Sequence, residues 1–146
     1  MQLALPARAE NIAIVRHAFG ALGEAYALDT QTLSDIRLAV TEACTNVVVH
    51  AYPDGEEGAM EVLATLLGDE LTVVVRDEGE GIGPRPDSPG LGLGLPLIAS
   101  LAESVQLGRD EAERTEVRMT FSLYDDLEHY GDTGNSHTPT DPSMST

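Results

Sequence analysis

The order of the hydrophobic patterns along this chain leaves few ways to fold it. Apolar residues recur at helical spacing from about residue 8 to 28 and again from about 32 to 52. Five shorter runs are typical of strands and a further one of a helix; they are 2–5, 59–67, 70–76, 104–108 and 115–123 for the strands and 91–103 for the helix. This order favours a helical layer on one face of a mostly antiparallel sheet, so the expected fold class is α+β.

Length and composition indicate a single domain with a tail. The chain has 146 residues, about the length of one domain. After Tyr124 it becomes acidic and then rich in Ser, Thr, Pro and Gly, with almost nothing to bury. We therefore expect residues 1–124 to form the domain and residues 125–146 to be a disordered acidic and polar tail.

The charge pattern excludes several functions. A net charge of −17 argues against a nucleic-acid or anionic-membrane surface, because phosphate binding needs dense positive charge. Lysine is absent, which excludes the phosphate-binding loop ending in Gly-Lys-Ser/Thr and the ordinary protein-kinase lysine. No apolar run is long enough to span a membrane. The lone Cys44 fits a reducing compartment, so the expected location is cytoplasmic.

The second helical stretch is two-sided. Its apolar residues fall on one stripe of a helical projection, namely Leu33, Ile36, Val40, Cys44 and Val47. Glu42, Asn46 and His50 form a polar row on roughly the opposite side. That row is either a solvated helix face or a place where an acid and an amide meet a metal and a phosphate. Cys44 is expected to be a small buried apolar residue rather than a nucleophile.

Two glycine-rich segments come next. The first directly follows the strand at 70–76, and the second follows the loop after it. Asp77 stands on a glycine turn; such an Asp often only bonds its own backbone, but its carboxylate could instead accept from an exocyclic amine such as adenine N6. Gly79 and Gly81 would then let the backbone approach the ring. Residues 90–94 read G-x-G-x-G at the start of a helix, which is weak evidence alone because glycine clusters mark ordinary loops. Together the segments suggest a nucleotide site.

This ordered set of motifs resembles the Bergerat-fold ATP-binding family, a histidine-kinase-like group, and within it most of all the anti-sigma-factor serine/threonine kinases. The resemblance spans about residues 3–123 and implies a two-layer α/β sandwich. The stretches that carry it are Glu42-Ala43 to Thr45-Asn46 with His50-Ala51-Tyr52, Asp77-x-Gly79-x-Gly81-Ile82, Gly90-x-Gly92-x-Gly94-Leu95 and Thr115-x-Val117. Arg114 stands where the family has a glycine, and Arg85 is the only arginine in a short, proline-rich lid.

The resemblance also implies roles for individual residues. Glu42 would be the general base, and Asn46 would coordinate Mg²⁺ between the phosphates of ATP. Asp77 would bind adenine, with Thr115 supporting it through a water. The full set implied to contact nucleotide is Asn46, His50, Asp77, Gly79, Gly81, Ile82, Gly90, Gly92, Leu93, Gly94 and Thr115.

The implied function is an ATP-dependent kinase that phosphorylates a serine or threonine of a small antagonist protein and regulates a sigma factor or similar partner. The resemblance further implies a homodimer, with Arg16 as a partner contact. The apolar residues beside Arg16 on the first helix, namely Ile12, Val15, Phe19 and Leu22, either serve that interface or pack on the sheet. Two alternatives remain: an ATP-binding module that sequesters its partner without phosphotransfer, and, more weakly, a histidine-kinase fragment with His17.

Overall fold

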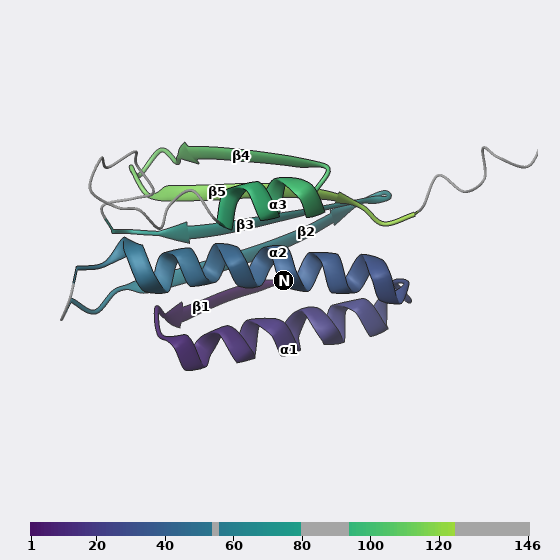
Figure 1. The fold of residues 1–146 in the computed structure, drawn as a ribbon, viewed down its shortest axis with the longest axis horizontal. Coiled ribbons are helices and arrows are strands. Elements are labelled where there is room, and N and C mark those ends of the chain that lie inside the picture. The colour runs from purple at the N-terminus through teal and green to yellow at the C-terminus, as the bar shows by residue number, and fades with distance from the viewer. Residues whose placement is uncertain (54–55, 80–93, 125–146) are drawn as a thin grey trace, which may run out of the picture.

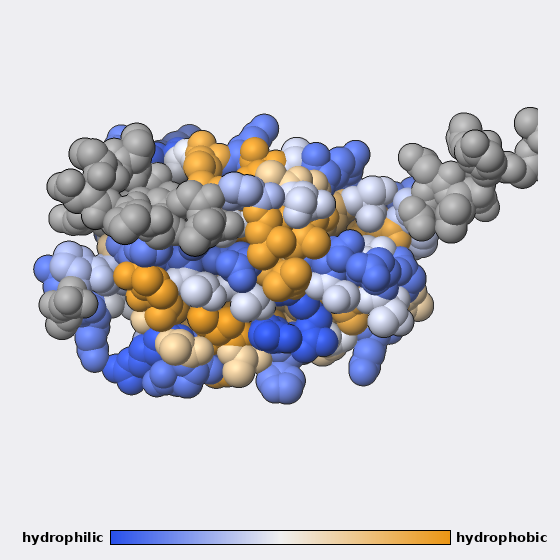
Figure 2. Space-filling model, viewed as in Figure 1, coloured by the Kyte–Doolittle hydropathy of each residue, from blue (hydrophilic) through white to orange (hydrophobic). Residues whose placement is uncertain are grey.

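The computed structural model describes residues 1–53, 56–79 and 94–124. Its strands form one sheet in the order β1-β2-β3-β5-β4, and every neighbouring pair is antiparallel. All the described helices lie on the same face of that sheet (Figure 1), and Figure 2 shows hydrophobic residues gathered where α3 meets α2. The α+β sandwich expected from the sequence is confirmed. The strands are β1 Gln2–Pro6, β2 Ala59–Leu67, β3 Glu70–Asp77, β4 Ser104–Arg109 and β5 Thr115–Ser122.

The helices pack the core against the sheet. They are α1 Ala9–Ala25, α2 Thr30–Asn46, the short π-helix η1 Val47–Ala51 and α3 Gly94–Leu101. Asp29 caps α2 by accepting a hydrogen bond from the backbone N–H of Thr32 at 2.9 Å, an interaction worth about 1 kcal/mol. Phe19 of α1 and Ile36 of α2 are fully buried beneath the sheet. No helix among the described residues is long and apolar enough to cross a membrane.

Hairpins fix the register that positions the candidate site. Gly68 turns between β2 and β3 with a φ of +60°, a backbone conformation that glycine adopts at little cost. In the resulting register Asp77 lies directly between Met60 of β2 and Thr115 of β5. Side chains alternate along a strand, so Asp77 continues the helix-facing row of Leu71, Val73 and Val75, all of which are buried.

The end of the second helical stretch differs from the prediction. We expected one α-helix to about Tyr52, whereas the α-helix ends at Asn46 and the chain continues as the π-helix η1. The hydrophobic spacing of Val47 to Ala51 does not distinguish an α-helix from a π-helix, because either helix would bury one side of the segment. In a π-helix the hydrogen bonds join residues five apart rather than four, so each turn contains more residues. His50 therefore no longer lies one α-helical turn after Asn46.

Cys44 behaves as expected. It is fully buried in the core, and burial raises the pKa of its thiol to about 12. The thiol therefore stays protonated at physiological pH and acts as a small apolar side chain rather than as a nucleophile.

Candidate functional site

Asp77 is a buried acid at the end of a central strand. Only 3% of its surface is exposed, and its neighbours across the sheet, Met60 and Thr115, are buried as well. Its Oδ1 accepts a hydrogen bond from the backbone N–H of Gly79 at 3.0 Å. Burial raises the pKa of Asp77, and the bond from Gly79 opposes that shift. An ionisable group kept in a place that disfavours its charged form is characteristic of a functional site.

The glycine turn after Asp77 rests on the end of η1. A Cβ added to Gly79 would lie 1.9 Å from the carbonyl oxygen of Ala51, a distance that no side chain could occupy. We expected Gly79 to be small so that the backbone could approach a ligand. The structure gives a second reason: Gly79 must let the turn touch the helix. This contact joins the turn after the acid of β3 to the end of η1.

Asn46 is the most informative side chain of the site. It is 6% exposed, and its Nδ2 has no hydrogen-bond partner within the described part of the chain. A Cβ added to Gly94 would lie 3.0 Å from Nδ2 and 3.1 Å from Oδ1, so the amide sits against the first residue of α3. A buried, unpartnered amide is costly unless a ligand satisfies it. The polar row of the second helix is therefore not a solvated face at Asn46.

The other two members of the polar row are less enclosed. Glu42 lies one α-helical turn before Asn46 and is partly exposed. His50 lies in η1 and is partly exposed, and its side chain forms no hydrogen bond within the described part of the chain. The structure thus brings Glu42 and Asn46 together on one side of α2, while the role of His50 stays a prediction.

A metal at this position would have to be shared with a ligand. No group of three or more His, Cys, Asp or Glu that could hold an ion occurs among the described residues. Mg²⁺ does not need such a cage, because it commonly binds one or two protein oxygens together with substrate phosphates and waters. The unsatisfied amide of Asn46 beneath the start of α3 fits this requirement. Helix N-termini also favour phosphate oxygens.

Arg114, which lines a hollow together with Asp77, is held by ion pairs. Its Nε contacts Asp110 Oδ2 at 2.7 Å, and its Nη1 contacts Glu61 Oε2 at 3.1 Å. Both acids belong to a charged network on the open face of the sheet, in which Arg76 Nε also contacts Glu116 Oε2 at 2.8 Å. An arginine at this position is therefore held by ion pairs rather than turned towards the helix-facing side of Asp77.

Several predicted site residues lie outside the described residues. They are Gly81, Ile82, Gly90, Gly92 and Leu93, together with Arg85 of the lid. Of the glycine-rich segments, the structure describes Gly79 and Gly94, and both lie where the site needs a close backbone contact. Tyr52 belonged to the helix motif but had no assigned role. Its hydroxyl, which bonds two other segments, is a contact that the sequence pattern does not reveal.

Comparison with known proteins finds a family that covers most of the chain. The model of the histidine kinase-like ATPase domain matches residues 5–121. Serine-protein kinase RsbW of Bacillus cereus strain Q1 is 31% identical over 126 residues, which cover 76% of this chain and 78% of that protein. RsbW of Halalkalibacterium halodurans is 32% identical over 125 residues, covering 75% and 76%.

A solved structure shares the fold. The RsbU and RsbW domains of a Mycobacterium tuberculosis protein match with a TM-score of 0.65 at 23% identity, over 84% of this chain and 32% of that one. The chain therefore spans about a third of that structure, and the match speaks for the fold alone. By the domain match and by its relatives, this chain belongs to the histidine kinase-like ATPase family, alongside the serine-protein kinases RsbW.

Proposed function

We propose that this protein is an ATP-dependent serine/threonine kinase of the anti-sigma-factor type, which phosphorylates a small antagonist protein and regulates a partner such as a sigma factor. The observation that carries the proposal is the unpartnered amide of Asn46, buried against the first residue of α3. An amide in that position, one helical turn after Glu42, suits a site that holds phosphates and a metal rather than a packed core.

Within this site each residue has a separate task. Asp77 accepts from the exocyclic amine of adenine, and Thr115, buried beside it, supports that contact. Asn46 holds Mg²⁺, and the first amides of α3 hold phosphate oxygens. Bound ATP would supply the phosphoryl group, and Mg²⁺ would supply the positive charge that a lysine contributes in other kinases. Glu42 accepts the proton of the serine hydroxyl as its oxygen bonds to the γ-phosphorus and the bond to ADP breaks.

The experiment for this proposal is a pull-down from the native cytosol with and without Mg·ATP, followed by transfer of radiolabelled phosphate to the captured proteins. A kinase of this type captures a small protein and labels it on serine or threonine. Label on histidine would favour the histidine-kinase alternative instead. Capture without any label would favour the sequestration module.

A groove between α1 and α2 is our candidate for partner binding. It has a volume of about 380 Å³ and is lined by Arg16, Arg37 and Leu38, among others. The Nε of Arg37 is buried and has no partner within the described part of the chain, and Leu38 is 42% exposed. Two arginines beside an exposed leucine, on a chain of net charge −17, suit an acidic partner segment with an apolar side chain.

We therefore predict that Arg16→Glu weakens capture of the partner by at least about tenfold, because it places like charge against an acidic segment. ATP-induced stabilisation should not change, since Arg16 lies outside the nucleotide site. Arg109→Glu is the matched control: Arg109 is exposed and lies in β4, at the sheet edge furthest from β1 and the groove. Equal capture by wild type and Arg16→Glu would remove this groove from the proposal.

We also propose a homodimer. The apolar residues of α1 that suggested a dimer pack within the domain instead. Val15 and Phe19 are buried, and Ile12 and Leu22 pack against the core. A dimer would need another surface, and Ile14, which is 47% exposed, offers one. Light scattering at tens of micromolar (roughly the range for a weak dimer) should give twice the monomer mass, and Ile14→Glu should halve it. Monomer mass for wild type would contradict the prediction.

A further inference from the structure

Tyr52 ties three segments together at the edge of the candidate site. Its hydroxyl accepts a hydrogen bond from the backbone N–H of Glu78 at 3.1 Å and donates one to the carbonyl oxygen of Ala59 at 2.5 Å. Tyr52 follows η1, Ala59 begins β2, and Glu78 directly follows Asp77. A single phenol therefore connects the end of the second helix, a strand start and the turn that carries the adenine-binding acid.

The backbone leaves room for this ring. A Cβ added to Gly58 would lie 1.9 Å from Cε1 of Tyr52, so any side chain at position 58 would displace the ring. On the other side of the turn, a Cβ added to Gly79 would lie equally close to the carbonyl oxygen of Ala51. The turn at residues 77–79 is thus fixed from two directions, by a helix end that touches Gly79 and by a phenol that holds Glu78.

The phenol stays protonated under physiological conditions. Burial raises the pKa of Tyr52, and the negative charges of Asp77 and Glu78 raise it further, although the bonds to Glu78 and Ala59 oppose the shift. A neutral phenol keeps the proton that it donates to Ala59 while its oxygen accepts from Glu78. Both hydrogen bonds therefore coexist at neutral pH.

We propose that Tyr52 is a positioning residue for base selection, which fixes the turn at Asp77 so that its carboxylate accepts from a base with an amine at C6. This inference rests on the proposed ATP site. Adenine carries an amine donor at C6, where guanine carries an oxygen acceptor, so a carboxylate held in place favours adenine and repels guanine. A turn that can shift by a fraction of an ångström loses part of that discrimination.

The test compares Tyr52→Phe with wild type by calorimetric titration of Mg·ATP and Mg·GTP. We expect wild type to prefer ATP by at least about tenfold. Without the hydroxyl, the Kd for ATP should rise about fivefold, the loss typical of one net hydrogen bond, while the Kd for GTP changes little. In phosphotransfer the KM for ATP should rise while kcat stays within about twofold, because Tyr52 does not contact the reacting atoms.

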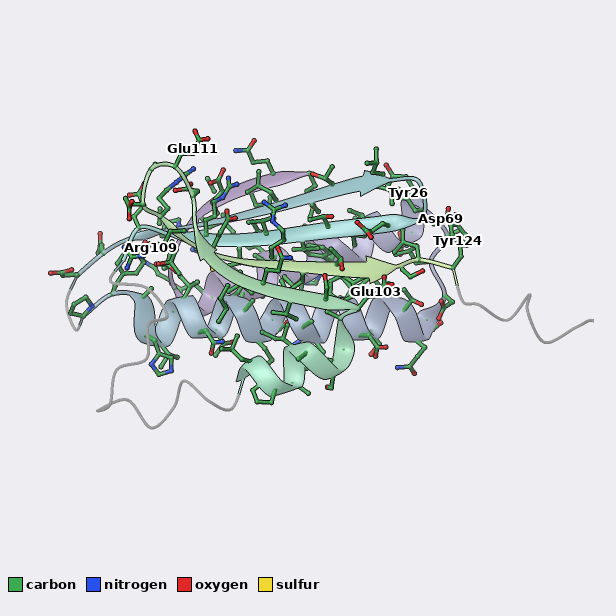
Figure 3. All side chains as sticks on the ribbon, turned by 90° about the horizontal axis from the view of Figure 1, so that it is seen from above. Tyr26, Asp69, Glu103, Arg109, Glu111 and Tyr124 are labelled. Carbon is green, nitrogen blue, oxygen red and sulfur yellow. The ribbon has the colours of Figure 1, made fainter. Side chains whose placement is uncertain are left out.

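Matched controls separate positioning from general loosening. Tyr26→Phe removes the same atom from a tyrosine that is 51% exposed, and Figure 3 shows Tyr26 at the end of the molecule opposite Arg109. A second variant, Gly58→Ala, should reproduce the loss of ATP preference by displacing the ring. Gly20→Ala is its control, because a Cβ at Gly20 would meet nothing within 4 Å.

The outcomes are distinguishable. If wild type prefers ATP and Tyr52→Phe keeps the full preference, the inference is wrong although the ATP site stands. Equal losses for ATP and GTP would indicate a structural role only and would also overturn it, as would a wild type that binds both nucleotides alike. A wild type that binds neither nucleotide would instead overturn the proposed function.

Discussion

Asp77→Asn is expected to abolish the stabilisation of this protein by Mg·ATP. A ligand at 100 times its Kd raises the free energy of unfolding by about 2.7 kcal/mol, so the wild-type shift should be large and easily measured by thermal denaturation. The variant keeps the size of the side chain and an oxygen that can accept from Gly79. It loses the negative charge and one acceptor atom that adenine requires.

The raised pKa of Asp77 makes this result interpretable. The folded protein binds a proton at Asp77 more tightly than the unfolded chain does, so the ionised carboxylate costs stability as pH rises past its pKa. Asparagine removes that cost, and the variant without nucleotide should be at least as stable as wild type at neutral pH. A lost shift then reports lost binding rather than unfolding. Asp69→Asn is the control, because Figure 3 shows the exposed Asp69 at the other end of the molecule.

Retention of the full ATP shift by Asp77→Asn would contradict the assigned role of this carboxylate. A reduced shift accompanied by a similar fall in the melting temperature of the free protein would argue that the side chain serves the fold. These two results are distinguished by measuring the melting temperatures of Asp77→Asn and Asp69→Asn with and without nucleotide across the same pH range.

Glu42→Gln should lower phosphotransfer by about 10²–10⁴-fold, the usual contribution of general-base catalysis. The amide keeps the size and polarity of the side chain but accepts no proton. The affinity for ATP should barely change, because Glu42 is assigned to the hydroxyl of the protein substrate and not to the nucleotide. The measurement is the rate of labelled phosphate transfer to the captured partner at saturating Mg·ATP.

Two further variants serve as comparisons for Glu42→Gln. Asn46→Ala, one helical turn away, should instead weaken Mg·ATP binding itself, because it removes the buried amide beside Gly94. Glu103→Gln changes an exposed acid just after α3 and should leave both properties unchanged. Full transfer by Glu42→Gln would show that another group accepts the proton. Binding of ATP and partner by wild type without any transfer would support the sequestration module.

Much of the fold could be predicted because strands and amphipathic helices have different periods. The expected bounds of the strand at 59–67 match β2, and the turn at Gly68 forms the hairpin. Asp77 at the end of a buried strand was equally visible, since it follows an apolar run and precedes glycine. These features depend on residues close together in the sequence, where local spacing carries the information.

The rest of the site depends on contacts between distant segments. Nothing near Asn46 predicts that α3 covers it, so a solvated helix face was an equally good interpretation of the polar row. The switch from α-helix to π-helix after Asn46 leaves the hydrophobic pattern almost unchanged. Arg114 stood where a glycine was expected, but its ion pairs with Asp110 and Glu61 hold it on the open face of the sheet. Such pairings are absent from any single stretch of sequence.

The most direct test of the site is a crystal structure with Mg²⁺ and a non-hydrolysable ATP analogue. We predict the base within hydrogen-bond distance of the Asp77 carboxylate and the phosphates between Asn46 and the first turn of α3, on the helix-covered side of the sheet. A hollow of about 250 Å³ is lined by Arg76, Glu61 and Arg114 as well as by Asp77. Phosphates bound beside Arg76 and Arg114 instead of at Asn46, or no nucleotide bound at millimolar concentration, would contradict the account.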